Sequence, residues 1–329
     1  MTKIGVALAA GGSVGVAYHG GVLAAIAETT GWDAGEADLL IGTSAGSVTS
    51  AMLRAGVPAV DLARISEGRP LSAQGSKLMT LGRPRRPKPS ARHALGFRPV
   101  SDPRGVLRSV SRPWSLNPRA LALAAMPSGF IPTTSLSDGL DALFPGGWPD
   151  RALWICSYDQ KGGRRVVFGR PGAPEATVGR AVAASSAIPS HFAPVEIEGR
   201  RYVDGGVSSM VNLDILAGAG LDVVVVVSPL TQASPWPSLS ATTVVRQVLG
   251  LQLRREVAAL RSTGVEVAVI QPGRRAAAAM GINPMDAARR GDVSRAAREE
   301  VESWLAGAGG SLGRLLRDRG RFVRGSKAV

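Results

Sequence analysis

The chain has 329 residues, of which 45% are hydrophobic, so it is long enough to bury the core of one large α/β domain or of two smaller ones. Lysine and arginine exceed aspartate and glutamate by 39 − 25 = 14, which favours acidic partners such as anionic lipid surfaces, phosphorylated substrates or nucleic acid. A single cysteine excludes an intramolecular disulfide, and cysteine and histidine are too scarce for a structural zinc site of the usual kind, which needs at least two cysteines.

The first residues resemble a signal peptide, because Lys3 precedes a long uncharged stretch and residues 7–9 look like a cleavage site. Several glycines interrupt this stretch, however, and it divides more naturally into a strand, a turn and a helix. No other segment reaches the roughly 18 uninterrupted apolar residues of a membrane span. We therefore expect a cytoplasmic protein, and leave open a peripheral location at the membrane.

Residues 4–9 are predicted to form a buried parallel strand, residues 10–15 a glycine turn and residues 16–28 a helix. This order also describes a dinucleotide site, whose fingerprint needs glycine at the first, third and sixth positions of the turn. Here Ala10 stands at the first position, and the second strand runs into Ser44 instead of ending in an acidic residue. The turn is better suited to aim its backbone amides at a developing negative charge.

Residues 42–46 spell G-T-S-A-G between an apolar run that ends at Ile41 and a small-residue helix predicted over 45–53. Strand, tight turn and helix are the context that a nucleophile elbow requires. Gly42 and Gly46 let the turn bend without side-chain collisions and expose the Ser44 hydroxyl, while the amide of Ala45 points at any oxyanion formed there. Parallel pairing of the two strands would bring this elbow beside the glycine turn.

A further helix is predicted over residues 58–67, and regular patterning then decays from 68 to 132. Arginine, proline and serine dominate this stretch, as in R-P-R-R-P-K-P at 83–89. A connection of this length inside a domain is usually a lid, a binding insertion or a disordered segment. We predict an inserted basic cap or loop region, with phospholipid binding and a solvated loop as equal alternatives.

Regular structure resumes at residue 133, where S-L-S-D at 135–138 resembles a capping box before a helix that ends near Phe144. Strands are predicted over 153–157, 165–168, 201–203, 222–227 and 265–270, and helices over 178–185, 212–217, 242–261 and 292–305. Cys156 falls in the first of these strands and is expected to be buried. A single domain is predicted over 1–310, followed by a basic tail over 311–329. We expect this tail to be solvated, with contact to anionic lipid as the alternative.

A serine nucleophile needs a base, and the histidines are poorly arranged to supply one. None of the three follows residue 204, contrary to the serine, acid, histidine order of α/β-hydrolases; His191 remains a minor alternative. Asp204 ends a short strand, and Gly205 and Gly206 let the backbone after it approach another turn closely. Taken alone, Asp204 is better explained by a solvated surface turn. Beside Ser44, a carboxylate in a low-dielectric pocket can accept the hydroxyl proton directly.

At these residues the chain resembles the patatin-like phospholipase family. Residues 42–46 match its nucleophile elbow, residues 204–206 its D-G-G/A motif, and residues 10–15 stand where its glycine-rich oxyanion turn should be. Residues 184–189 and 202–207, with Asn212 beyond them, look like flanking blocks of bacterial members. The resemblance covers 1–57 and 133–228, and it implies a three-layer α/β/α fold with a central, mainly parallel sheet.

The resemblance also implies a serine lipid acyl hydrolase of the phospholipase A type, which needs no metal ion or cofactor. Ser44 would attack the ester carbonyl, Asp204 would take its proton and later activate water, and the oxyanion or substrate would be held by Gly11, Gly12, Ser13, Gly15 and Ala45. The implied partner is a phospholipid or other acyl-ester lipid, with an anionic membrane surface as a further option and no nucleic acid.

Two departures from the family pattern leave other functions open. Ala10 replaces the usual first glycine of the oxyanion turn, and Val14 replaces the basic residue commonly found before its last glycine. Head-group preference and catalytic rate are therefore in question. The alternatives are a carboxylesterase or lysophospholipase for soluble or single-chain esters, and a catalytically weak lipid- or membrane-binding protein.

Overall fold

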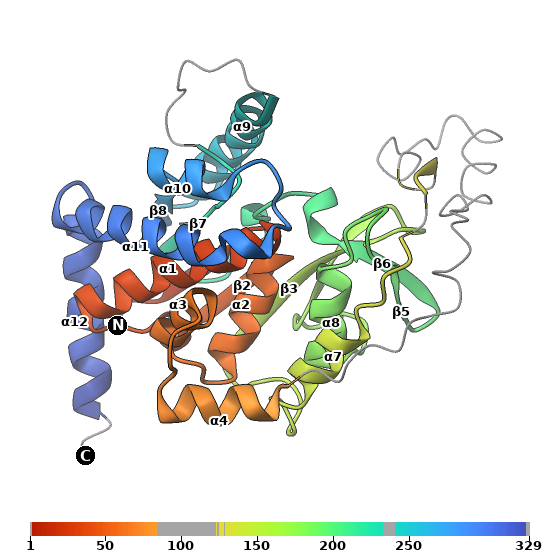
Figure 1. Cartoon of the computed structure of the whole chain (residues 1–329), viewed down its shortest axis with the longest axis horizontal. Helices are drawn as coiled ribbons and strands as arrows, with labels where there is room; N and C mark the ends of the chain where they lie inside the picture. The colour runs from red at the N-terminus through yellow and green to blue at the C-terminus, as the bar shows by residue number, and fades with distance from the viewer. Residues whose placement is uncertain (1, 84–122, 124, 128, 233–240, 327–329) are drawn as a thin grey trace.

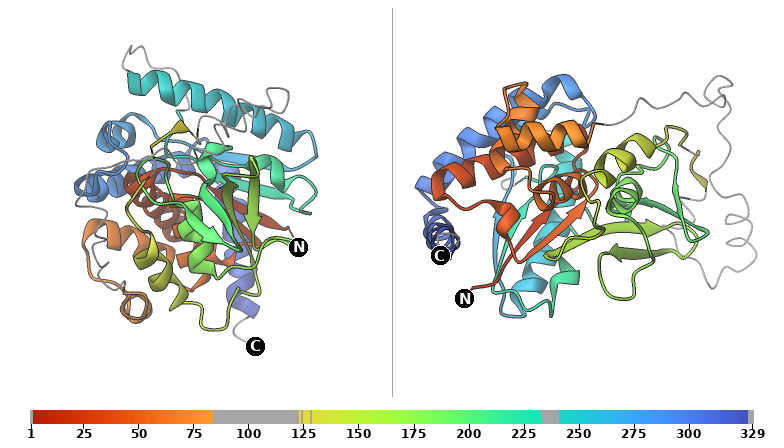
Figure 2. Two further views of the ribbon diagram at one scale, coloured as in Figure 1. Left: turned by 90° about the vertical axis from the view of Figure 1, so that its right-hand side faces the viewer. Right: turned by 90° about the horizontal axis from the view of Figure 1, so that it is seen from below.

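The computed structural model describes residues 2–83, 123, 125–127, 129–232 and 241–326 (Figure 1). These residues form a mixed, mostly parallel sheet with helices against both of its faces, as Figure 2 shows from two further sides. The prediction of a three-layer α/β/α fold is confirmed. Most of the predicted basic cap, residues 84–122 included, lies outside the described residues.

The strands in chain order are β1 (Ile4–Leu8), β2 (Leu39–Thr43), β3 (Ala152–Asp159), β4 (Arg164–Phe168), β5 (Val195–Ile197), β6 (Arg200–Asp204), β7 (Val223–Val227) and β8 (Glu266–Ile270). The helices are α1 (Gly12–Thr30), α2 (Ala45–Arg54), α3 (Ala59–Glu67), α4 (Ala73–Leu81), α7 (Thr134–Asp141), α8 (Val178–Ser185), α9 (Ala241–Arg261), α10 (Arg274–Met280), α11 (Arg290–Ala306) and α12 (Gly310–Ser326).

The sheet has the order β5-β6-β3-β2-β1-β7-β8, with β4 paired to β3 off this path. Strands β3, β2, β1, β7 and β8 are parallel, whereas β4, β5 and β6 run antiparallel to their neighbours. Central strand β7 consists of five valines, all buried. Such a continuous β-branched run is typical of a strand that helices cover on both faces.

Alternation along the strands divides the core into two layers. Ile4, Val6 and Leu8 of β1 belong to a cluster that includes side chains of α1, α2, α3 and α11. Ala7 belongs to a second cluster with Leu253, Val257 and Leu260, from the carboxyl-terminal half of α9. Because successive strand residues point to opposite faces, α9 covers the face of the sheet opposite α1.

Strand β3 brings two chain segments together at one of its edges. Ile155 and Cys156 pair with both β2 and β4, and residues 157–159 pair with both β4 and β6. Since a strand has only two edges, β2 and β6 share the edge opposite β4. Thr43 pairs with Cys156 and Asp204 with Ser157, so the antiparallel strands β2 and β6 end toward each other at neighbouring positions.

Several boundary predictions are wrong. Helix α1 begins at Gly12, four residues earlier than predicted, because Gly12 adopts a φ of 63° and turns the chain from β1 almost directly into the helix. The predicted capping box is not formed: Ser135 lies inside α7, and Thr133 makes no side-chain cap. Asp141 instead accepts from the Gly179 amide at 2.6 Å, at the start of α8.

The carboxyl-terminal segment also differs from its prediction as a solvated tail. Residues 310–326 form α12, which buries Leu312 and Leu316 in the same cluster as α1 and α11. Arg319 on this helix forms an ion pair with Asp38, at 3.3 Å. An apolar stripe among arginines therefore folds the segment back onto the domain.

Within the predicted insertion, residues 73–81 form helix α4 instead of loop. Ser72 begins it, since its hydroxyl oxygen accepts from the Gly75 amide at 3.0 Å. Asp61 of α3 in turn accepts from the amide of Ser72, at 3.0 Å. This helix is polar over most of its surface, which explains why its hydrophobic pattern does not stand out.

Candidate active site

Ser44 occupies the turn between β2 and α2, where the sequence predicts an elbow. Its backbone has a φ of 53° and a ψ of −118°, an unusual conformation for a residue with a side chain. The flanking glycines are sterically required. A Cβ on Gly46 would lie 1.8 Å from the Leu8 carbonyl oxygen, and one on Gly42 would lie 2.5 Å from the Gly46 carbonyl oxygen.

Hydrogen bonds from three other elements hold this strained turn. The Ser44 amide donates to Ser185 Oγ at 2.9 Å, and Ser185 Oγ donates to the Cys156 carbonyl at 2.6 Å. Within α2, Ser47 Oγ donates to the Ser44 carbonyl at 2.6 Å. Ser185 is thus a residue that fixes the elbow and that motif reasoning missed, although it lies within the 184–189 block of the family resemblance.

Asp204 ends β6 and faces Ser44. Its carboxylate accepts a hydrogen bond at 2.7 Å from the Gly206 amide, and it lies near enough to the Ser44 hydroxyl for that group to lower its pKa. Its own amide donates to the Ala187 carbonyl at 3.0 Å. The residue is 5% exposed, and this burial raises the pKa of Asp204 to about 6, although the Ser44 hydroxyl and the Gly206 amide act in the opposite direction.

Asn212 links the segment after Asp204 to the strand before Ser44. Its Nδ2 donates to Thr43 Oγ1 at 3.0 Å, and its Oδ1 accepts from Arg165 at 3.0 Å. The residue is fully buried in a left-handed conformation with a φ of 61°. Asparagine tolerates this conformation better than most residues, so Asn212 suits both the turn and the amide contacts.

The glycine turn lies directly beside the elbow, as parallel pairing of β1 and β2 predicts. A Cβ on Gly15 would lie 3.3 Å from Ala45 Cβ, so the first turn of α1 packs closely on the start of α2. The Gly15 amide donates to the Gly11 carbonyl at 3.0 Å and is therefore not available to a ligand. Gly15 acts as a spacer between two helices, and not as a donor.

Other amides at the two helix starts are free to bind. Within the described part of the chain, no acceptor contacts the backbone N–H groups of Gly11, Gly12, Ser13 or Ala45. Their neighbour Val14 donates instead to the Pro284 carbonyl at 3.1 Å, and Ala10 donates to the Met210 carbonyl at 2.9 Å. Free amides at adjacent helix amino termini are suited to bind a negative charge.

The two described histidines, His19 and His191, make none of the hydrogen bonds given above for Ser44, Asp204 and Asn212. His19 is completely buried, with Nδ1 3.4 Å from Thr49 Oγ1, and burial lowers the pKa of His19 to about 3. His191 is exposed and stacks edge-on against Phe192. His93 lies outside the described residues. Cys156 is buried in β3, as predicted, and burial raises the pKa of its thiol to about 12.

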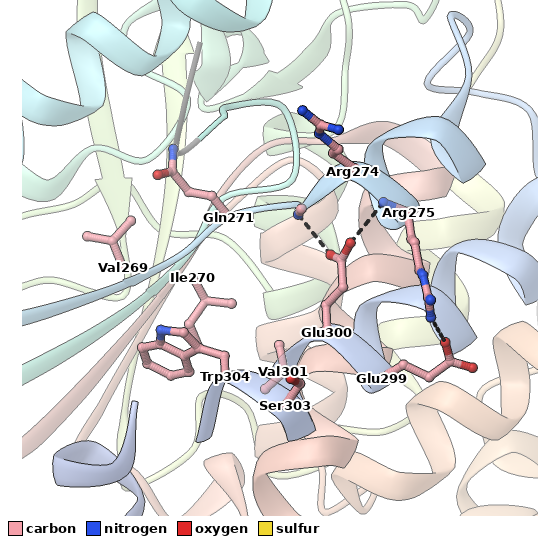
Figure 3. A pocket seen from close by; sticks show the side chains of 11 residues that line it. Val269, Ile270, Gln271, Arg274, Arg275, Glu299, Glu300, Val301, Ser303 and Trp304 are labelled. Atoms are coloured by element: carbon pink, nitrogen blue, oxygen red, sulfur yellow. Dashed lines mark hydrogen bonds and ion pairs between the residues drawn. The ribbon is translucent and has the colours of Figure 1, made fainter. Parts of the chain in front are cut away.

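A cavity of about 550 Å³ lies between β8, α10 and α11, and none of the predicted site residues lines it. Figure 3 shows the side chains that line this cavity. Its main carboxylate, Glu300, already accepts from the amides of Gly273, Arg275 and Ala276 at 2.8–3.2 Å. Its neighbour Glu299 pairs with the Arg275 guanidinium at 3.3 Å. These acidic groups are therefore used to hold α10 in place.

A second cavity, of about 280 Å³, has walls formed by α9, α10 and the segment that follows α10. Val14, in the first turn of α1, forms part of its lining, so this cavity adjoins the glycine turn.

The described residues lack both a metal-binding cluster and a membrane-spanning helix. They contain no group of three or more histidine, cysteine, aspartate or glutamate side chains arranged to hold a metal ion. Among the helices that the structure describes, none combines the length and the apolar character needed to cross a membrane.

Comparisons with known proteins indicate the family to which the chain belongs. The family model described as patatin-like phospholipase matches residues 6–217. Among solved structures, the chain is similar to VipD from Legionella pneumophila, with 15% sequence identity and a TM-score of 0.44, over 93% of this chain and 67% of VipD. No curated protein matches the sequence.

Proposed function

The chain belongs to the patatin-like phospholipase family, and from this premise we propose that it is a serine lipid acyl hydrolase of the phospholipase A type with a Ser44–Asp204 dyad. The observation that carries the proposal is the placement of Ser44, held at a positive φ, beside the buried carboxylate of Asp204, whose pKa the Ser44 hydroxyl lowers. A nucleophile in hydrogen-bond contact with its base is the basic unit of covalent acyl transfer.

In the first half-reaction, Ser44 Oγ attacks the ester carbonyl while its proton passes to Asp204. The amides of Gly11, Gly12 and Ala45, with Ser13 close by, stabilise the oxyanion of the tetrahedral intermediate. When the intermediate collapses, Asp204 returns the proton to the leaving alcohol, and the acyl group remains on Ser44 as an ester.

In the second half-reaction, Asp204 removes a proton from water, which attacks the acyl-enzyme carbonyl. Collapse of this intermediate releases the fatty acid, and Ser44 recovers its proton through Asp204. The raised pKa of Asp204, about 6, supports this role, because a carboxylate in this range is a stronger base than a solvated aspartate.

We further propose that the chain works at an anionic membrane surface, through an apolar face next to the smaller cavity. Five large apolar residues are about half exposed or more there: Val244, Val245, Val248 and Leu251 of α9, and Ile282. Arg254 and Arg255 are exposed on the same helix. Contiguous apolar surface flanked by cations is suited to insertion among anionic lipid head groups.

Two narrower alternatives make different predictions. A carboxylesterase or lysophospholipase would prefer monomeric short-chain esters to lipids in micelles or vesicles. A catalytically weak lipid-binding protein would bind liposomes equally well after Ser44→Ala and would turn over no ester. The free amides beside Ser44 favour the catalytic alternatives.

Labelling with a fluorophosphonate tests the proposed nucleophile directly, because the reagent phosphonylates only an activated serine. Peptide mass spectrometry should find the adduct on Ser44, and Asp204→Asn should slow its formation by about a hundredfold or more. Ser50→Ala, which removes another buried hydroxyl of α2, should still be labelled on residue 44. An adduct elsewhere, or none on folded protein, would refute the assignment of Ser44.

A further inference from the structure

The smaller cavity, of about 280 Å³, adjoins the glycine turn and is mostly apolar. Its walls include Val14 of α1, Leu249 of α9, and Met280 and Ile282 at and after the end of α10. The hydrogen bond from the Val14 amide to the Pro284 carbonyl fixes one wall to the start of α1. A ligand in this cavity would therefore lie next to the amides that the mechanism uses.

One cation lines this apolar cavity. Arg246 of α9 donates to the Pro229 carbonyl at 2.8 Å, and its Nη2 lies 3.2 Å from Met280 Sδ. It forms no ion pair with any described residue. Burial lowers the pKa of Arg246, so its charge is partly stripped of water without a carboxylate to balance it. Such a guanidinium favours an anionic ligand.

Pro229 connects Arg246 to the glycine turn. Its carbonyl accepts from Arg246, and its ring packs on the first turn of α1: a Cβ on Gly11 would lie 2.6 Å from Pro229 Cγ, and one on Gly15 would lie 3.4 Å from it. Arg246 and the free amides of the turn are thus separated by a single residue. An anion held by Arg246 would therefore lie one residue away from the amides proposed to hold the oxyanion.

We propose that Arg246 binds the phosphodiester of a phospholipid substrate in this cavity, and so sets a preference for phospholipids over neutral acyl glycerols. This inference rests on the proposed lipid hydrolase function. A guanidinium has five N–H donors in a planar fork, and a carbonyl and a thioether leave enough of them for a phosphate. The apolar walls suit the glycerol backbone and the adjoining methylenes of the acyl chains.

The first experiment compares a short-chain phospholipid with its neutral counterpart, dihexanoyl phosphatidylglycerol with dihexanoylglycerol, both below their micellar concentrations. Arg246→Gln should lower the ratio of the two kcat/KM values by about tenfold or more, mainly through the KM for the phospholipid. Arg246→Lys, which keeps the charge but not the fork, should lower it less. Arg314→Gln, at an exposed arginine of α12 outside the proposed lipid-binding face, should leave the ratio unchanged.

An unchanged ratio in Arg246→Gln, with both rates intact or reduced in parallel, would overturn the proposal. A parallel loss would mean that Arg246 acts through Pro229 on the glycine turn. Melting temperatures of the variants show whether they fold, and Arg246→Lys provides the comparison if the glutamine variant does not.

A binding measurement separates failure of this inference from failure of the proposed function. Calorimetry with Ser44→Ala, with and without Arg246→Gln, uses dihexanoyl phosphatidylglycerol, sn-glycerol 3-phosphate and inorganic phosphate as probes. Binding of the lipid that weakens about tenfold on losing Arg246 supports the site even if no ester is turned over. Equal affinity for inorganic phosphate would identify a free-phosphate site and overturn the lipid assignment, as would binding that ignores Arg246.

Discussion

The buried carboxylate of Asp204 lies beside the Ser44 hydroxyl, and its pKa of about 6 makes the proposed base testable by pH. The protonated acid cannot accept the proton of Ser44. We therefore expect kcat/KM for a soluble ester to fall below about pH 6 with a limiting slope of one. Circular dichroism at each pH excludes unfolding as the cause. A profile that stays flat to pH 5 on folded protein would contradict a base with this pKa.

The ionised carboxylate of Asp204 should lower the free energy of unfolding at neutral pH. Its folded pKa is raised from 3.8 to about 6, so its contribution to stability is fully present below 3.8 and is lost as the pH rises through 6. Asp204→Asn should therefore stabilise the fold at pH 8 by on the order of 2 kcal/mol, and the gain should shrink toward pH 4. Urea unfolding of both chains at the two pH values measures this, and a loss of stability at pH 8 would contradict it.

Sequence reasoning proposed Ser44 and Asp204 as site residues because they lie in short motifs with characteristic glycines. Ser185 and Asn212 support the site through hydrogen bonds over long sequence separations, and neither belongs to a local pattern with a chemical meaning of its own. Gly15 was assigned to the binding set, but its amide is used within α1. Only the three-dimensional hydrogen-bond pattern distinguishes a free amide from a used one.

At the scale of elements, α9 has two different halves. Its carboxyl-terminal half buries Leu253, Val257 and Leu260 against the sheet, whereas Val244 and Val248 in the other half are 50% and 60% exposed. We expect Val244→Asp with Val248→Asp to reduce binding to vesicles rich in phosphatidylglycerol about tenfold or more, because a carboxylate disfavours both apolar insertion and an anionic surface.

The matched control is Leu81→Asp, since Leu81 is 56% exposed on α4. It should change vesicle binding little, and hydrolysis of a soluble ester should survive in all these variants. Equal binding by wild type and the α9 variant in a flotation assay would show that this face does not dock on lipid.

Strands and helices with strong hydrophobic patterns were predicted well, and the remaining errors have physical reasons. Helix α4 is short and polar, and β5 has only three residues, so neither has a clear hydrophobic period. The early start of α1 depends on one glycine at positive φ, which a sequence does not reveal. The order β5-β6-β3-β2-β1-β7-β8 depends on contacts between distant segments.

For the molecule as a whole, β3 explains how the site is assembled. Thr43 and Asp204 pair with consecutive residues of β3 although 161 positions (204 − 43) separate them in the chain. The proposed nucleophile and base therefore meet because two strands end toward each other along one edge. The fold also places a cation near the glycine turn, because Arg246 of α9 lines the same cavity as Val14.

The carboxyl-terminal helix should contribute to global stability. Leu316 of α12 is completely buried, and Arg319 pairs with Asp38, whose carboxylate also accepts from the Ile4 amide at 2.7 Å. Leu316→Ala should lower the free energy of unfolding by about 2–4 kcal/mol, whereas Arg314→Ala at an exposed position of the same helix should change it by less than about 1 kcal/mol. Equal stability of the two variants in urea would mean that the segment is solvated, as the sequence alone suggested.

The most direct test of the dyad is hydrolysis of a p-nitrophenyl ester, with EDTA present, by wild type, Ser44→Ala, Asp204→Asn and His191→Ala. We expect wild type and His191→Ala to be active, and the other two variants to lose a factor of roughly a thousand or more in kcat. Activity that survives in Asp204→Asn but disappears in His191→Ala would contradict the dyad and assign the base to a histidine.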